Sequence, residues 1–376
     1  MKTTHAVAAC LLILAGTACA QPGGSSSPAK PAPGPAPQPG TPPQSFQLEA
    51  AKPYTNIEKS QQRERSLALL QNLARSDNAL LRANAIEGML PTPARCEPLV
   101  RAGLADDNLG VRFAAAMAVG RLRLKNSAPM VRPLLSDPDP SVRAAAAFAL
   151  IRTGNNADQT ELSSMLMSGD ARARSNAAYI LGELGNASAA PMLRDAARQP
   201  MPSDAPIAVR LYRLQLAEAL VKLGDKTASD TVEAALYPSS REDFEAAVLA
   251  AQIIGEVKAE KAAGQLVNLI EMQPASAGKP SDPRQAVYLQ PRELRLAAAS
   301  SMAKMGYFGG WYVGDMYANA DEPAVRAQAA FVLGATAHKQ TLNASLSRLE
   351  RMLDDANPLV QCSAAAALLK TLQRND

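Results

Sequence analysis

The side chains that could perform acid–base or metal chemistry are scarce in this chain of 376 residues. It has two histidines, His5 and His338, and four cysteines, of which only Cys96 and Cys362 lie beyond the first twenty residues. A metal site needs several ligands at close spacing, and a nucleophilic triad needs a histidine with organised partners. His338 falls in an expected turn without such partners, so we expect a solvated loop residue there. We therefore predict no catalytic residue, no metal and no cofactor.

The charge and composition limit the function classes further. The net charge of +4 is mild, whereas nucleic-acid binding usually needs a concentrated basic stripe, so no nucleic-acid partner is expected. Aromatic residues make up only 4% of the chain, and alanine is abundant. Because small side chains let helices approach closely, this composition favours stacked helices.

Residues 134–154 show how such helices would be arranged. The stretch indicates the end of one helix, a sharp turn and a second helix. Asp139 can cap the second helix by accepting from its free N–H groups, and Pro140 suits the first helical position. An alanine-rich run follows, and Gly154 can end the helix in the left-handed conformation. One hairpin of this kind cannot bury its apolar face alone, so copies of it must stack.

The same hairpin recurs with a period near 31 residues. With Arg143 as the anchor, the equivalent positions are Arg82, Arg112, Arg174, Arg213, Ala247, Arg295, Arg326 and Gln361. N-cap residues stand four positions before most anchors, at Asn78, Asn108, Asp139, Asp170, Asp243 and Asn357. Helix stops are expected at Gly120, Gly154, Gly182, Gly185, Gly224, Gly255, Gly306 and Gly334. Residues 46–376 are therefore predicted to form an all-α, right-handed α-solenoid of about nine hairpins, helical from about Asn56.

The repeated Asp-x-Asp-Pro-x-Val-Arg-x-x-Ala-Ala-x-Ala-Leu pattern resembles HEAT repeats, in the short HEAT-like form of phycobilisome lyases. The resemblance covers roughly residues 58–371. It implies a ladder of hydrogen bonds between neighbouring repeats, made by an Asp at the turn and an Arg on the second helix. The matching pairs are Asp106 with Arg112 and Asp137 with Arg143. The resemblance implies a fold and a style of binding, but no single function.

The first nineteen residues indicate export. Ala6 to Ala18 is apolar but too short to span a membrane, as in a signal peptide. The stretch from Ala15 to Cys19 resembles a bacterial lipobox, in which Cys19 would be lipidated and become the mature N-terminus. That arrangement predicts an outer-membrane or periplasm-facing lipoprotein. The alternative is ordinary cleavage after Ala20, which would give a soluble secreted protein.

Three further segments depart from the hairpin pattern. Residues 20–45 are rich in Pro, Gly and Ala and are predicted to be a disordered tether. The insertions Gln199–Pro206 and Gln273–Pro291 are either tolerated surface loops or loops that contact a partner, with Arg284 and Tyr288 as the best contacts of the second. Five aromatic residues within 307–317 form either a bulky core or an exposed patch that anchors a partner.

The second helices present a candidate partner surface. The third, fourth, sixth and seventh positions after each anchor are apolar and expected to be buried, while the second, fifth and ninth lie on another face. Where second helices line the concave side, as in HEAT-like solenoids, this face forms a groove. Its middle section contains Met117, Arg121, Phe148, Arg152, Asn176, Tyr179 and Glu183. Phe148 and Tyr179 would anchor a partner segment, and the charged residues would set its register. A plain solvated face is the alternative.

These features predict a non-catalytic scaffold of the cell envelope, anchored through Cys19, that binds a partner protein on its concave face. One alternative is a phycobilin-lyase-like or other small-molecule-handling factor, and another is a nucleic-acid-binding HEAT-like repair protein. The export signal argues against both. The lack of an organised nucleophile or base also argues against the first, and the mild charge against the second.

Overall fold

The computed structural model describes residues 51–201, 205–238, 240–275 and 286–374. In these ranges all regular structure is helical, and eighteen α-helices form nine hairpins, which confirms the predicted all-α solenoid. The first helix begins at Asn56, as expected. The predicted signal peptide with Cys19, the tether and Arg284 lie outside the described residues. Within those ranges, no helix combines the length and the apolar character needed to cross a membrane.

Each hairpin pairs an odd-numbered helix with the even-numbered helix that follows it. The first helices are α1 (Asn56–Leu73), α3 (Pro93–Gly103), α5 (Ala128–Val131), α7 (Thr160–Leu166), α9 (Ala190–Arg198), α11 (Ser229–Ala234), α13 (Ala263–Glu271), α15 (Trp311–Tyr317) and α17 (Leu342–Met352). The second helices are α2 (Ala79–Gly88), α4 (Leu109–Leu122), α6 (Pro140–Arg152), α8 (Ala171–Leu184), α10 (Pro206–Lys222), α12 (Phe244–Glu256), α14 (Arg292–Lys304), α16 (Pro323–Ala335) and α18 (Pro358–Arg374). Every anchor position falls on a second helix.

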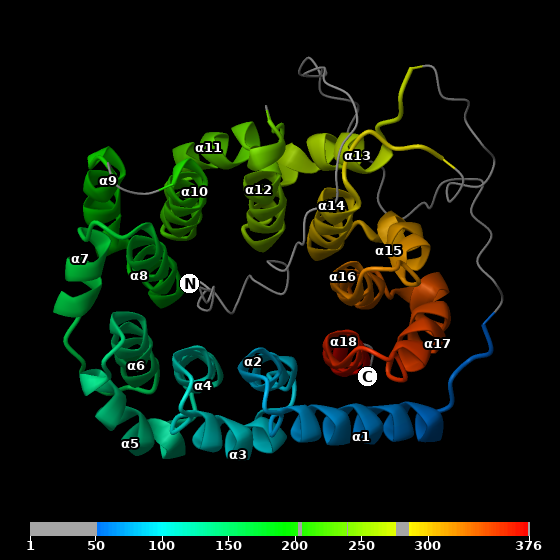
Figure 1. Ribbon diagram of the computed structural model, residues 1–376, viewed down its shortest axis with the longest axis horizontal. Coiled ribbons are helices and arrows are strands. Elements are labelled where there is room, and N and C mark those ends of the chain that lie inside the picture. Colours follow the sequence, from blue (N-terminus) through cyan, green and yellow to red (C-terminus); the bar gives the residue numbers. More distant parts are fainter. Residues whose placement is uncertain (1–50, 202–204, 239, 276–285, 375–376) are drawn as a thin grey trace. The chain divides into compact units, whose positions relative to one another are not determined.

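The helices belong to two compact units. The first unit spans Leu67–Thr231, and the second combines residues 51–66 with residues 232–374. Within the first unit, α4, α6, α8 and α10 form an inner layer and α3, α5, α7 and α9 an outer layer (Figure 1). The second unit has the same two layers, with α12, α14, α16 and α18 inside (Figure 1). The core lies between the layers, and alanines make close packing possible there: Ala144 to Ala147 of α6 are at most 1% exposed.

The predicted N-caps are largely confirmed, because capping depends on local sequence. The Asp139 carboxylate accepts from the backbone N–H groups of Ser141 and Val142, at 2.8 and 3.4 Å. Equivalent side-chain caps begin four other second helices, at Asn78, Asn108, Asp170 and Asn357. The prediction was wrong for Asp243, which adopts a helical conformation and does not cap α12.

The glycines expected to stop helices divide into two classes. Four of them do end a second helix with a positive φ: Gly154, Gly185, Gly224 and Gly306. The other four, Gly120, Gly182, Gly255 and Gly334, lie inside second helices, so their assignment as stops was wrong. They permit close approach instead: a Cβ on Gly182 would lie 3.0 Å from Ala219 Cα, and one on Gly255 would lie 2.7 Å from Ser301 Cα. The helix pairs that contain them, α4/α6, α8/α10, α12/α14 and α16/α18, pack most extensively.

A ladder of arginine–aspartate pairs joins successive hairpins, but not in the pairs implied by the resemblance. Arg112 donates to the Asp137 carboxylate of the next hairpin at 2.7 and 3.1 Å, while its Nη1 donates to the backbone carbonyl of Asp106 at 2.8 Å. Two further pairs have the same form: Arg82 with Asp106, and Arg326 with Asp355. Arg143 does not pair with the Asp137 side chain.

The role of Arg143 illustrates the correction. It donates to the Asp137 carbonyl at 2.7 Å and to the Glu161 carboxylate of the next hairpin at 2.8 Å. A ladder between neighbouring repeats is therefore present, but each arginine reaches forward to the next hairpin rather than to the carboxylate of its own turn. The three arginine–aspartate pairs are mostly buried, with side chains 4–19% exposed, whereas Arg143 and Glu161 are 28% and 32% exposed.

The aromatic residues within 307–317 form a core rather than an exposed patch. Trp311 and Tyr312 are 7% and 2% exposed, and the Trp311 indole donates to Ser345 Oγ at 2.8 Å. Phe308 stacks on His338 with ring centroids 4.4 Å apart, so His338 is a packed residue and not a solvated one. Tyr307, Phe308 and Tyr317 are half-buried, so none of the five aromatic residues is fully exposed.

The two cysteines of the solenoid are buried and are not joined in a disulfide. Cys96 lies in α3 and Cys362 in α18. Burial raises the pKa of the Cys96 thiol to about 12, so the reactive thiolate is suppressed. Both side chains therefore act as small packing residues.

Candidate functional site

The predicted groove is not open along its middle section. Met117 and Phe148 are 0% and 1% exposed, Asn176 is 3% exposed and Tyr179 is 8% exposed. The prediction that Phe148 and Tyr179 face solvent was therefore wrong. Phe148 packs directly on Gly120 of the neighbouring helix, where an added Cβ would lie only 2.3 Å from the ring. Close approach of the second helices thus places the fifth positions in the core.

The charged residues of the predicted groove do reach the surface. They lie at the ninth position after each anchor, where the second helices end. The inner charged row consists of Glu87, Arg121, Arg152, Glu183 and Lys222, all in the first unit. All five side chains are partly exposed. Glu87 is the exception, since it stands at the fifth position after Arg82, but it too lies at the end of its helix. Helix ends project beyond the packed core, which explains why these five side chains stay accessible.

Arg121 shows that the inner layer of the first unit is concave. Its guanidinium lies 3.8 Å from Glu87 of α2 and 3.7 Å from Glu183 of α8, and it donates to the Tyr179 hydroxyl. Arg121 belongs to α4, whose neighbours in the inner layer are α2 and α6, so its contacts with Glu183 and Tyr179 of α8 reach across α6. Such contacts between next-but-one helices require strong curvature of the layer. The inner charged row is therefore a narrow surface whose side chains are joined by ion pairs and hydrogen bonds, and not a wide open groove.

Lys222 lies at the other end of the row and is paired with two carboxylates. Its Nζ lies 2.8 Å from Glu183 and 2.7 Å from Glu218, and 5.6 Å from the centre of the Tyr179 ring. Burial alone would lower the pKa of Lys222, but Glu218 and Glu183 together raise it above its ordinary value. Lys222 therefore stays charged at any physiological pH.

Arg152 differs from both neighbours. Its Nε is buried without a hydrogen-bond partner, and within the described ranges it forms no ion pair. It lies in α6, between the helices that carry Arg121 and Glu183, and it is only partly exposed. Arg152 is thus the one cation of the row without a counter-charge among the residues described.

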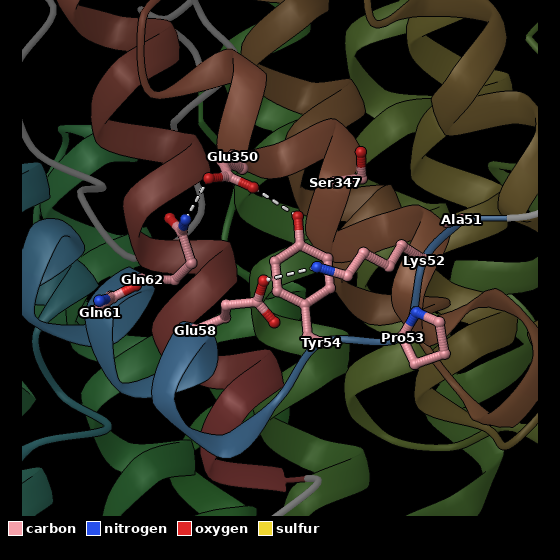
Figure 2. Close-up of a pocket in the computed structure, with 9 residues that line it drawn as sticks. All are labelled: Ala51, Lys52, Pro53, Tyr54, Glu58, Gln61, Gln62, Ser347 and Glu350. Atoms are coloured by element: carbon pink, nitrogen blue, oxygen red, sulfur yellow. Dashed lines mark hydrogen bonds and ion pairs between the residues drawn. The ribbon is translucent and has the colours of Figure 1, made fainter.

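A second polar site lies in the second unit, beside the residues that precede and begin α1. Figure 2 shows Tyr54 and Gln62 directed at the same carboxylate, that of Glu350 on α17. A pocket of about 340 Å³ lies beside them. It is lined by Ala51, Lys52, Pro53, Tyr54, Glu58, Gln61, Gln62, Ser347 and Glu350. No sequence signal could have found it, because the two sides lie almost 300 positions apart.

Neither site has the form of a catalytic or metal centre. Among the described residues, no three His, Cys, Asp or Glu side chains are grouped so that they could hold a metal ion. The inner charged row is a set of ion pairs on helix ends, and the pocket beside Glu350 is lined by hydrogen-bonded polar groups. What both can offer is recognition through charge and hydrogen bonding.

Comparison with known proteins identifies the repeat. A family model described as HEAT repeats matches residues 66–150 and 128–210. No curated protein matches the chain. The complex of CpcE and CpcF of phycocyanin lyase from Nostoc sp. PCC7120 is a similar solved structure, with 17% identity, a TM-score of 0.39 and coverage of 73% of this chain and 98% of that one. Human deoxyhypusine hydroxylase in complex with glycerol has 15% identity, a TM-score of 0.33 and coverage of 84% and 99%. At such TM-scores these likenesses carry no functional argument.

Proposed function

Because this chain is a HEAT-like repeat protein, we propose that it is a non-catalytic scaffold of the cell envelope that binds a partner protein. The inner charged row is the proposed contact surface. A solenoid of stacked hairpins holds such a row rigidly, so little ordering is needed when a partner binds. Phe148 and Tyr179 have no part in the proposal, because both are buried.

The unmatched charge of Arg152 is the observation that supports this proposal. A guanidinium that is partly removed from water is unfavourable unless an opposite charge compensates it. Arg121 and Lys222 have carboxylates beside them, whereas Arg152 has none within the described chain. A carboxylate of a partner would supply that counter-charge. The surrounding ion pairs would then select the register in which the partner lies.

The envelope location rests on the first 45 residues, which combine a short apolar segment, Cys19 and a Pro-rich tether. Cell fractionation tests it. Wild type should be found in the membrane pellet, and Cys19→Ala should move most of the protein to the soluble fraction. Equal membrane shares for the two would contradict lipidation and leave simple secretion as the route.

Crosslinking in cells tests the contact surface. Arg152→Glu should lower the yield of the captured partner by about tenfold or more, because it replaces attraction with repulsion. Arg198→Glu is the matched control: Arg198 is an exposed arginine of α9, outside the row, and should leave the yield unchanged. If the two variants capture the partner equally well, the inner charged row is not the contact. A bound pigment or other small molecule instead of a protein would favour the small-molecule-handling alternative.

A further inference from the structure

Residues 51–66 are joined to α17 and the turn after it by a set of polar contacts. The Tyr54 hydroxyl and the Gln62 amide both donate to the Glu350 carboxylate. The Tyr54 backbone N–H donates to Asn343 Oδ1 at 3.4 Å, and Arg65 pairs with Asp354. These contacts join the beginning of the described chain to α17 and to the turn that follows it. Figure 2 shows the Tyr54 and Gln62 contacts converging on Glu350.

The α17 side of this contact consists of hydrogen-bond acceptors. Asn343 and Glu350 lie seven residues apart on one face of α17, and Asp354 lies in the turn two residues after the helix ends. The segment presents the matching donors: a backbone N–H, a phenol, an amide and a guanidinium. Burial and Glu350 both raise the pKa of Tyr54, so its hydroxyl remains a donor. The two surfaces are therefore complementary in charge and in hydrogen bonding.

This contact has little hydrophobic support. Within residues 51–66 no large aliphatic side chain is buried, and Ile57 is 72% exposed. The buried members are the polar Gln62 and Ser66. The apolar residues that α1 does bury, Leu67, Leu70 and Leu73, all lie after this segment. Hydrogen bonds contribute about 1 kcal/mol each in net terms, whereas ordering backbone costs about 1–2 kcal/mol per residue. The segment therefore lacks the apolar burial that stabilises the rest of the stack, and its attachment depends on these few polar contacts.

We propose that residues 51–66, here called the strap, can detach from the rest of the solenoid. The acceptors that hold the strap, Asn343 and Glu350 of α17 and Asp354 in the turn after it, are here called the seat, and we propose that the seat can bind another copy of the strap. When the strap leaves, Asn343, Glu350 and Asp354 are free to bind the same segment of a second copy of this chain. The contacts made within one chain and between two chains are chemically identical, which is the condition for exchange of a segment between protomers. This inference depends neither on the inner charged row nor on Cys19.

Hydrogen exchange on the full chain tests release. In Tyr54→Ala/Gln62→Ala, backbone amides of residues 57–66 should exchange about tenfold faster or more than in wild type, with α18 unchanged. Glu350→Gln is a second variant that disturbs the same contact from the seat, and it should give the same pattern. Asp195→Asn, in an exposed ion pair of α9, is the control and should change nothing in this region. If amide exchange accelerated equally in residues 57–66 and in α18, or did not accelerate at all, the proposal of a releasable strap would be wrong.

A peptide with the sequence of residues 51–66, carrying a fluorescent label, tests the seat. It should bind Tyr54→Ala/Gln62→Ala at least about tenfold more tightly than wild type, whose own strap competes for the seat. Adding Glu350→Gln and Asp354→Asn to that variant should abolish binding. Equal binding with and without the seat substitutions would overturn the proposal, and so would equal binding to wild type and to the strap variant.

Discussion

Arg112 and Arg295 occupy the same anchor position in their hairpins but stabilise the solenoid in different ways. Arg112 forms two hydrogen bonds with Asp137 of the next hairpin. Arg295 is 0% exposed and donates to the Ile270 carbonyl at 2.8 Å and to the Tyr317 hydroxyl at 2.5 Å. Its guanidinium carbon lies 3.2 Å from the centre of a third group, the Tyr288 ring.

The next hairpin decides between these two arrangements. Arg112 meets an aspartate six residues before the following anchor, whereas the corresponding position after Arg295 is Ala320, which offers no carboxylate. The insertion Gln273–Pro291 supplies Tyr288 instead. Its last residues are fastened to the hairpin, since Leu289 N–H donates to the Met272 carbonyl at 2.9 Å. The same arginine can therefore join two hairpins or hold an insertion, depending on what faces it.

Replacing Arg295 should have the largest effect on stability. Arg295→Ala should lower the free energy of unfolding by about 3–5 kcal/mol, because it removes a fully buried side chain and leaves the polar groups of Tyr317 and Ile270 without a donor. Urea unfolding followed by circular dichroism measures it. Arg295→Met keeps most of the volume and should lose clearly less. Equal losses for the two variants would show that hydrogen bonding, and not packing, dominates.

Replacing Arg112 should have a smaller effect. Arg112→Ala should cost about 1–3 kcal/mol, since Asp137 loses its charged partner while both groups retain some access to water. Arg198→Ala removes an exposed arginine of α9 and serves as the control, with a change below about 0.5 kcal/mol. If Arg112→Ala is as mild as the control, the ladder does not stabilise the stack and the contrast with Arg295 concerns burial alone.

The contrast explains which parts of the fold the sequence could predict. Hairpins and N-caps such as Asp139 depend on neighbours a few residues away, so the pattern predicted them correctly. The residue types of the ladder were also predictable, but its pairing was not, because the register between repeats depends on how hairpins stack. The rule is visible afterwards: an anchor arginine pairs with an aspartate six residues before the next anchor, as Arg82, Arg112 and Arg326 do.

The glycines could have been separated by position. Those that stop a helix stand eleven residues after their anchor, as Gly154 does, whereas those that allow close approach stand eight residues after it, as Gly120 does. The candidate site was harder to predict. Phe148 is buried because the second helices curve and pack closely, and Tyr54 contacts Glu350 from a position far away in the sequence. Neither contact can be recognised from neighbouring residues.

The arginine–aspartate ladder should also make the free energy of unfolding depend on pH. Burial opposes ionisation of Asp137, but Arg112 and the Asp139 backbone N–H outweigh it and lower its pKa. Asp106 and Asp355 also have lowered pKa values, and in both an arginine favours the charged form. A carboxyl group whose pKa is lower in the folded state than in the unfolded state stabilises the fold. This contribution is complete at pH values above the unfolded-state pKa, about 4, and is lost as the pH falls through the folded-state pKa.

Unfolding in urea between pH 6 and pH 3 measures this dependence. Stability should fall below about pH 4, and Arg112→Ala should show a weaker fall than wild type because Asp137 no longer has its arginine. Arg295→Ala should keep the fall of wild type, since Arg295 donates to the Ile270 carbonyl, the Met316 sulfur and the Tyr317 hydroxyl, none of which is a carboxylate. Identical pH profiles for wild type and Arg112→Ala would contradict an electrostatic role for the ladder.

The smallest effect is expected at Tyr288, the residue of the insertion that lies over Arg295. Tyr288→Ala removes a cation–π contact worth about 1 kcal/mol, but Arg295 keeps its bonds to Ile270 and Tyr317. Global stability should therefore change little, while hydrogen exchange at Leu289 should accelerate because its bond to Met272 is no longer held in place. An unchanged rate at Leu289 would mean that Arg295 does not hold the insertion, and that its burial serves the hairpin alone.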